Sequence, residues 1–338
     1  MNTLAIAVAA AVLVTACAPG TPRPIDPAVG SMVPDVGSGT CVSAGAEEVA
    51  SFADANLERS VRRALEAGPD EPLTCQAVAR LTILHAPDAR IVELTGIEAL
   101  TGLQELYIYG NNSIRDVRPL TGLTELRDLN LARNEIEDIG PLAELGGLTS
   151  LSLTGNPIRD ITPLAALTGL TRLQVEQTAG VADLGALSGL ASLTRLELAG
   201  NQIVDVSPLA GLTQLRWLSL QDNAGVGDLG PLRHLSRLET LSLAGTSVTD
   251  LASLAHMPHL STLILEGTPV RDLGALIGLA HLSRLDLRGN RGLTDIQPLL
   301  FNTSLGRGDA VRLERTGVSC EDVAALRMTG VGVLAGCE

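Results

Sequence analysis

The chain has 338 residues, of which 45% are hydrophobic and only 1% aromatic, so its core is expected to consist of aliphatic side chains. Acidic residues outnumber basic ones by 38 to 24, and the formal net charge of -14 argues against nucleic-acid binding, which requires a basic surface. The charged fraction of 18%, together with the abundant aliphatic residues, excludes an intrinsically disordered chain.

The first residues are typical of an export signal. Residues 4–16 form an apolar stretch of 13 residues, shorter than the roughly 20 that a membrane-spanning helix needs, although no Lys or Arg precedes it. The stretch ends in Val14-Thr15-Ala16-Cys17, which resembles the bacterial lipobox. The resemblance implies that a signal peptide, residues 1–16, is cleaved and that Cys17 carries a lipid. The alternative is an ordinary signal peptide in which Cys17 is a bystander.

Residues 17–40 contain five prolines and almost no apolar periodicity, which predicts an extended tether that does not pack. If Cys17 is lipidated, this lipid is the only contact with the membrane that we expect. Ala18 follows Cys17 at the position where Asp would favour retention in an inner membrane, so the lipobox resemblance implies the outer membrane or the cell surface.

A unit of about 22 residues recurs from residue 97 to residue 299. It follows the pattern L-x-x-L-x-x-L-x-x-L-x-L-x-x-N-x-I-x-D-I-x-P, of which residues 120–141 and 187–208 are the cleanest copies. Five units have 22 residues and four have one extra residue directly after the Asn position, which indicates one tolerant loop. The nine units start at Ile97, Leu120, Leu142, Leu164, Leu187, Leu209, Leu232, Leu254 and Leu276.

The spacing within each unit predicts its backbone. Apolar residues three apart, such as Leu120, Leu123 and Leu126, favour a short helical or 3₁₀ turn, and residues two apart, such as Leu129 and Leu131, favour a short strand. Such a strand cannot bury its apolar face alone, whereas stacked units can. The sequence therefore predicts an α/β solenoid, a right-handed curved superhelix with a concave parallel β-sheet and short turns on the convex side.

Two polar positions also recur. The Asn position holds Asn111, Asn134, Asn156, Asn201, Asn223 and Asn290, with Thr178, Thr246 and Thr268 as replacements. The other position is Asp in all nine units: Asp116, Asp138, Asp160, Asp183, Asp205, Asp228, Asp250, Asp272 and Asp295. We expect the amides to satisfy backbone groups of adjacent coils and the carboxylates to cap the helical turns. A calcium ladder is the alternative for the Asp positions, but one carboxylate per coil supplies too few oxygens.

With its L-x-x-L-x-L-x-x-N-x-I-x-D-I-x-P-L units, the chain resembles the bacterial internalin-like leucine-rich repeat proteins. The resemblance implies caps at both ends of the nine repeats, residues 41–96 and residues 300–338. In the first cap a helix is expected over residues 52–65 and a second one from Thr74; in the last cap Ser319 is the expected N-cap of a helix over residues 320–328.

Lipidation of Cys17 would leave four of the five cysteines, two in each cap. Because disulfides persist in exported proteins, we predict that Cys41 pairs with Cys75 and Cys320 with Cys337. A zinc site does not fit these cysteines, since no pair has the two-residue gap and no His lies close in sequence.

Motifs for catalysis are lacking, and we expect no enzymatic activity, no cofactor and no metal site. No nucleophile motif, phosphate-binding glycine loop or catalytic domain is recognisable in the sequence. His234, His256, His259 and His281 fall at equivalent positions of neighbouring coils, so they either form a metal-binding or pH-sensing patch or are ordinary exposed turn residues.

Side chains between the buried leucines of each strand are expected to face outward as an ordered array on the concave side. Tyr, Trp and Arg dominate protein interfaces. The outward positions of the third, seventh and eighth units are mostly Ser, Thr and Ala. The candidate ligand-binding residues are Tyr107, Tyr109, Arg172, Glu176, Arg195, Glu197, Trp217 and Gln221.

The sequence therefore predicts a non-catalytic protein-recognition module, displayed in the cell envelope, that binds an unknown protein ligand on its concave face. One alternative is a glycan-binding or peptidoglycan-binding protein that stacks the same aromatic side chains on sugar rings. The other is a structural lipoprotein of the envelope.

Overall fold

The computed structural model describes residue 41 and residues 48–337. The chain divides into two units, residues 1–37 and 38–338, and all described residues belong to the second. The expected signal peptide, Cys17 and the tether lie outside the described residues. Within the described residues, no helix combines the length and the apolar character that crossing a bilayer requires.

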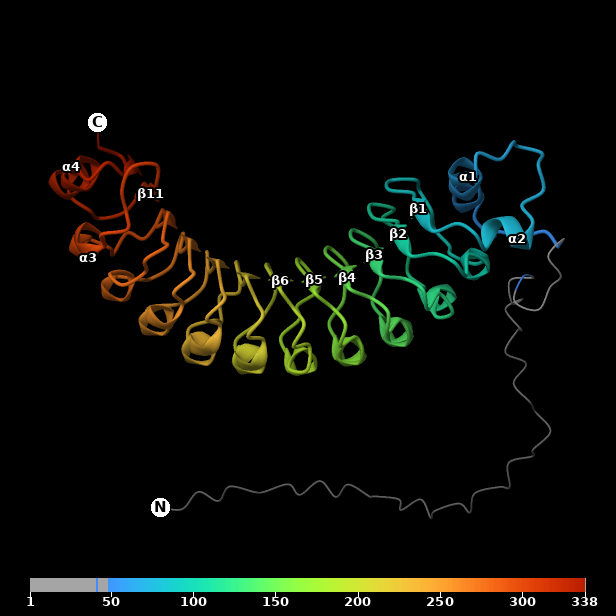
Figure 1. Cartoon of the computed structure of the whole chain (residues 1–338), viewed down its shortest axis with the longest axis horizontal. Coiled ribbons are helices and arrows are strands. Elements are labelled where there is room, and N and C mark those ends of the chain that lie inside the picture. Colours follow the sequence, from blue (N-terminus) through green and yellow to red (C-terminus); the bar gives the residue numbers. More distant parts are fainter. Residues whose placement is uncertain (1–40, 42–47, 338) are drawn as a thin grey trace, which may run out of the picture. The chain divides into compact units, whose positions relative to one another are not determined.

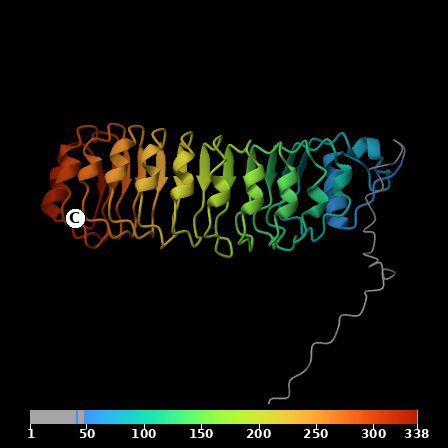
Figure 2. The same cartoon turned by 90° about the horizontal axis from the view of Figure 1, so that it is seen from below.

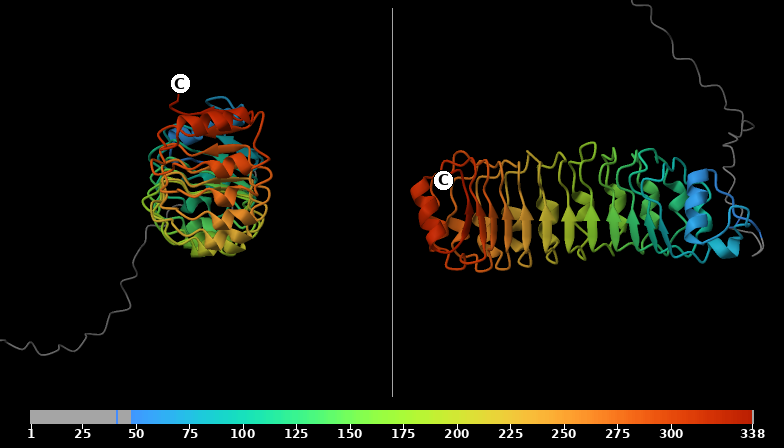
Figure 3. Two further views of the ribbon diagram at one scale, coloured as in Figure 1. Left: turned by 90° about the vertical axis from the view of Figure 1, so that its left-hand side faces the viewer. Right: turned by 90° about the horizontal axis from the view of Figure 1, so that it is seen from above.

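One parallel sheet of twelve strands runs through this unit in sequence order and lines the concave side of a curved solenoid (Figure 1), which confirms the predicted fold. In Figure 3, right, the strands form one row of parallel arrows. They are β1 (Ile83–His85), β2 (Glu105–Tyr107), β3 (Asp128–Asn130), β4 (Ser150–Ser152), β5 (Arg172–Gln174), β6 (Arg195–Glu197), β7 (Trp217–Ser219), β8 (Thr240–Ser242), β9 (Thr262–Ile264), β10 (Arg284–Asp286), β11 (Ala310–Arg312) and β12 (Gly332–Leu334).

The convex side carries nine 3₁₀ turns, which Figure 2 shows as a row in front of the strands. They are η1 (Ile97–Ala99), η2 (Arg118–Leu120), η3 (Gly140–Glu144), η4 (Thr162–Ala166), η5 (Gly185–Leu187), η6 (Ser207–Gly211), η7 (Gly230–His234), η8 (Ala252–His256) and η9 (Gly274–Leu276). Each turn buries a leucine, alanine or isoleucine against the inner side of the sheet.

The core is a stack of aliphatic layers. The central residue of every strand is buried, and it is Leu in the first ten strands and Val in the last two. Because the strands pair in register, each of these side chains lies beside its equivalent in the next coil. Burial of one such side chain contributes roughly 1.5–3 kcal/mol.

Where the recurring Asn position holds Asn, the side-chain amide lies inside the solenoid, between coils. Asn223 is fully buried; its Nδ2 donates to the carbonyl oxygens of Leu198 and Leu220, at 2.9 and 3.0 Å, and its Oδ1 accepts from the N–H of Ile203 at 3.1 Å. The amide thus satisfies backbone groups of its own coil and of the preceding one, which would otherwise be buried unpaired.

The recurring Asp side chains hold the starts of the helical turns. In each of the nine repeats the Asp Oδ1 accepts from the N–H two residues later, as in Asp138 to Gly140 at 2.8 Å and Asp205 to Ser207 at 2.7 Å. Hydrogen bonds from the backbone and side chain of Ser207 lower the pKa of Asp205. We expected the Asp itself to be the N-cap, but the N-cap is the residue that follows it, such as Ile139 or Val206. This residue is apolar and buried in the core, so the Asp caps the turn from one position further back.

At the amino-terminal end, the expected helices are α1 (Ala55–Ala64) and α2 (Cys75–Val78), and α1 lies beside β1 (Figure 1). Asp54 caps α1 through Oδ1, and its Oδ2 accepts from the N–H of Val92 at 2.8 Å. Burial tends to raise the pKa of Asp54, but hydrogen bonds from four backbone N–H groups outweigh it and lower that pKa. The Asp54 carboxylate therefore links α1 to the coil that contains β1.

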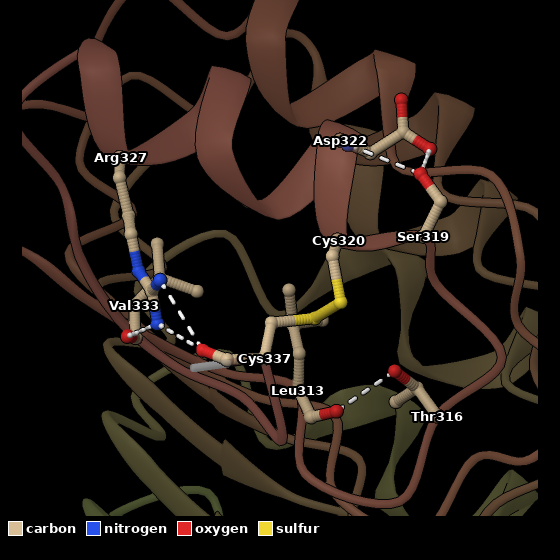
Figure 4. The surroundings of a disulfide bond; sticks show 8 residues. All are labelled: Leu313, Thr316, Ser319, Cys320, Asp322, Arg327, Val333 and Cys337. Atoms are coloured by element: carbon tan, nitrogen blue, oxygen red, sulfur yellow. Dashed lines mark hydrogen bonds between the residues drawn. A yellow bond between two sulfur atoms is a disulfide. The ribbon is translucent and has the colours of Figure 1, made fainter.

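At the carboxy-terminal end, α3 (Gln297–Phe301) takes the place of a 3₁₀ turn and α4 (Cys320–Met328) covers the last coils. Ser319 is the N-cap of α4, as the sequence predicts. Figure 4 shows the Cys320–Cys337 disulfide beside this cap, together with Arg327, whose Nη2 donates to the carbonyl oxygen of Val333 at 3.3 Å. The second disulfide joins Cys41 to Cys75 in the other cap.

The sheet extends beyond the nine repeats that the sequence pattern delimits. β1 lies within the segment expected as the amino-terminal cap, and β11 and β12 lie within the segment expected as the carboxy-terminal cap. The buried residues Leu84, Val311 and Val333 supply the apolar position of a strand. Leucines such as Leu81 and Leu313 flank two of them, but the Asn is absent and the leucine pattern of a full repeat is incomplete.

We predict that Asn223→Ala lowers the free energy of unfolding by about 3 kcal/mol, because it leaves the carbonyl oxygen of Leu220 and the N–H of Ile203 buried without partners, whereas the carbonyl oxygen of Leu198 keeps its hydrogen bond from Asn201. Equilibrium unfolding in urea measures this. The matched control is Gln104→Ala at an exposed position, for which we expect no more than about 0.5 kcal/mol. Equal losses for the two variants would contradict the role assigned to the buried amide.

We predict that replacing Cys320 and Cys337 with Ser loosens only the carboxy-terminal end. The bridge spans 17 residues, and closing such a loop stabilises by about 3 kcal/mol. Hydrogen exchange should become faster in α4 and β12 and stay unchanged in β2–β9. The pair Cys41→Ser and Cys75→Ser is the control, with faster exchange expected in α2 alone; cooperative loss of protection along the whole sheet would refute a local role.

Candidate functional site

The concave face carries three outward side chains per coil in regular rows. The first row, from β5 to β11, is Arg172, Arg195, Trp217, Thr240, Thr262, Arg284 and Ala310, as the strand register fixes. Neighbouring strands lie about 4.8 Å apart, so side chains on adjacent coils are in contact distance.

A tight polar and aromatic group forms around β6. The Cζ atom of Arg195 lies 4.2 Å above the centroid of the Trp217 ring, and its Nε forms an ion pair with Glu197. Glu197 is only 9% exposed and also accepts from Nε2 of Gln174 at 3.2 Å. The Trp217 side chain, which remains 36% exposed, is therefore held against a fixed guanidinium on one side.

Glu176 belongs to the same group. Burial and the neighbouring Glu197 carboxylate raise the pKa of Glu176, while the N–H of Ala199 and the Arg195 guanidinium oppose the shift. The group thus holds two carboxylates close together, with Arg195 as the nearby cation.

A second group surrounds Tyr107 on β2. Its ring centroid lies 4.3 Å from that of His85 on β1, and its hydroxyl donates to Oε2 of Glu105 at 3.1 Å. Burial, the Asp128 carboxylate and Glu105 raise the pKa of Tyr107 to about 12, so the hydroxyl remains a hydrogen-bond donor. Nearby, the guanidinium carbon of Arg133 lies 6.0 Å from the centre of the Tyr109 ring.

Five strand intervals separate Tyr107 from Trp217, a distance of about 24 Å along the sheet. Six of the eight candidate residues therefore fall into two groups. Arg172 connects them, because its Nη2 lies 3.5 Å from Oδ2 of Asp128, two strands away across the small Ser150. Gln221 lies apart from both groups and donates to Asp222 at 3.0 Å.

A pocket of about 430 Å³ opens on the carboxy-terminal side of Trp217. Trp217 lines it together with Ile264 of β9, Arg284 of β10, and Ala310 and Arg312 of β11. Sequence reasoning missed Ile264, although an aliphatic residue at an outward strand position could have marked it. Arg312 and His85 were missed because the sequence analysis assigned their strands, β11 and β1, to the caps.

Two of the four histidines at equivalent positions lie side by side. The rings of His259 and His281 stack with their centroids 5.9 Å apart, and Nε2 of His234 accepts from Arg233 at 3.0 Å. In the part of the chain that the structure describes, no cluster of three or more His, Cys, Asp or Glu side chains could hold a metal ion.

A family model described as leucine-rich repeats in two copies matches residues 101–144 and 124–166. No curated protein sequence matches the chain. Among solved structures, an internalin (inlF) from Listeria monocytogenes is 29% identical, with 84% of this chain and 90% of that chain covered and a TM-score of 0.71. Internalin C2 from the same organism is 27% identical over 68% of this chain and 92% of that one, with a TM-score of 0.55. A leucine-rich repeat protein from Leptospira interrogans, 20% identical over 70% of this chain and 74% of its own, shares the fold with a TM-score of 0.53.

We predict that Glu176→Gln stabilises the protein at pH 7 and that the gain disappears at pH 4. The raised pKa means that the ionised carboxylate opposes folding above its folded-state pKa, and that this cost is relieved as the pH falls toward 4.5, the ordinary value. Thermal unfolding at the two pH values measures the difference. Glu144→Gln, exposed on η3, is the control; a loss of stability for Glu176→Gln at pH 7 would contradict the prediction.

Proposed function

We propose that this internalin-like leucine-rich repeat solenoid is a non-catalytic protein-recognition module whose ligand binds the concave strand face. The observation that carries the proposal is the Arg195–Trp217 pair, where an exposed indole is held by a guanidinium beside an open pocket. Trp and Arg are the residue types that contribute most to protein interfaces, because they bury a large area in few conformations.

The sheet supports this role because it presents side chains that are already ordered. Arg195 is held by Glu197, Tyr107 by Glu105 and His85, and Arg172 by Asp128. A ligand therefore immobilises few additional side chains when it binds, and less conformational entropy is lost.

We further propose that the protein is exported and attached to the envelope by a lipid on Cys17, at the outer membrane or the cell surface. The two disulfides support export, because such bonds persist in oxidising compartments. Labelling of the native protein by a radioactive or clickable fatty acid, lost in Cys17→Ala, distinguishes lipidation from an ordinary signal peptide.

A glycan ligand is the second candidate, because an exposed indole such as that of Trp217 can also stack on a sugar ring. Against it, Arg195 already covers one face of the indole, which leaves only the other face for a sugar ring.

We predict that a photoreactive residue at position 221, which leaves Trp217 intact, crosslinks a discrete protein in the native cell. The matched control is position 213, exposed just after η6 in the same coil but on the convex side. Mass spectrometry of the two sets of adducts identifies the partner as the protein found only from position 221.

The same crosslink should decrease by about thirtyfold when Trp217→Ala is added, because loss of an interface anchor costs about 2 kcal/mol or more. Thermal unfolding of the variant checks that its fold is retained. Identical adducts from positions 221 and 213, or an adduct unaffected by Trp217→Ala together with Tyr109→Ala, would overturn the proposed function.

A further inference from the structure

The pocket beside Trp217 owes its depth to the short side chains of the next strand. Thr240 and Ser242 of β8 point to the concave side but are only 8% and 5% exposed. Trp217 therefore lines one pocket together with residues of β9, β10 and β11, beyond the neighbouring strand. The indole, Ile264 and Ala310 form the apolar part of its lining, beside the polar side chains of Thr262, Arg284, Asp286 and Arg312, so it can hold an apolar group next to a charged one.

Positive charge is concentrated at the far side of this pocket. Arg284 is exposed and forms no ion pair or side-chain hydrogen bond with any described residue. Arg312 lies 3.5 Å from Asp286, but that carboxylate is already engaged by Arg288, which donates to both of its oxygens at 2.9 and 2.8 Å. Arg288 also pairs with Glu266 at 2.6 Å, so the charge that stays without a partner is that of Arg284. The side chains that line the pocket, Arg284, Arg312 and Asp286, thus carry one excess positive charge in a chain of net charge -14.

We propose that this pocket binds an apolar side chain of the ligand that is followed or preceded directly by Asp, Glu or a chain-terminal carboxylate. The inference rests on the proposed protein-recognition function and specifies the chemistry of its anchor. The apolar side chain packs against Trp217 and Ile264, and the carboxylate forms a bidentate pair with the free guanidinium of Arg284.

A peptide fits these features better than a sugar. A sugar acid would also satisfy Arg284, and Thr262 and Asp286 could bind its hydroxyl groups. Its ring, however, would have to lie against Ile264, Ala310 and an indole of which Arg195 already covers one face. The volume of about 430 Å³ lies within the usual range of ligand sites, roughly 300–1,000 Å³, and is sufficient for one large side chain with its neighbouring carboxylate.

A random-peptide phage library, selected on the full-length oxidised protein, tests the proposal. Peptides enriched on the wild-type chain should share an apolar residue next to Asp, Glu or a carboxylate. Arg284→Glu should instead enrich an apolar residue next to Lys or Arg, because the sign of the charge at the pocket is reversed. Arg233→Glu, the same charge change on the convex turn η7, should enrich the wild-type consensus.

Binding of the synthesised consensus peptide is then measured directly. Trp217 is the only tryptophan of the chain, so a change in its fluorescence reports occupation of the pocket. We expect Arg284→Glu to weaken binding by about tenfold or more and Arg233→Glu to leave it unchanged. Near-identical thermal unfolding of the two variants excludes a folding defect.

Other outcomes overturn the proposal in distinguishable ways. Enriched peptides without an acidic group, or no enrichment at all, would reject the anchor chemistry, and the proposed function would still stand if position 221 crosslinks a specific protein. Binding to an array of acidic oligosaccharides, lost in Arg284→Glu and without any peptide consensus, would assign the pocket to a sugar acid and reject both proposals.

Discussion

The structure depends on one constraint, which is that no coil of this chain has a hydrophobic core of its own. A strand of three residues and a turn of three to five bury their leucines only against the coils on either side. Register, curvature and length follow from this stacking, because equivalent side chains must meet at the strand spacing. The outward side chains take no part in the core, which leaves them available for binding.

Stacking also buries backbone polar groups between coils and leaves the two end coils without a neighbour on one side. Each coil buries backbone groups where the chain leaves the strand, and amides such as Asn156 and Asn223 bridge them to the coil before. The end coils lack a neighbour on one side, and there the chain uses helices fixed by Asp54, Ser319 and the disulfides. A uniform interior is thus combined with specialised ends.

The repeat period was sufficient to predict the solenoid, since spacings of two and three between leucines dictate a strand and a turn. The ends were harder to predict, because β1, β11 and β12 keep the buried residue but only part of the surrounding leucine pattern, without the Asn. Outward positions such as Trp217 and Arg195 could be read from the alternation, but not their contacts. The direction in which a long side chain leans across its neighbours depends on three-dimensional context, so the pocket with Ile264 and Arg312 was not predictable.

The distance between the tyrosine group on β2 and the pocket beside β7 is set by a number of coils. Gain or loss of one whole repeat between them would change it by about 4.8 Å and leave both groups chemically intact, because consecutive strands pair in parallel and in the same register. The separation between the two groups can therefore change only in steps of one coil. Evolution could adapt it to a longer or shorter ligand by gene duplication or deletion, without redesigning either contact.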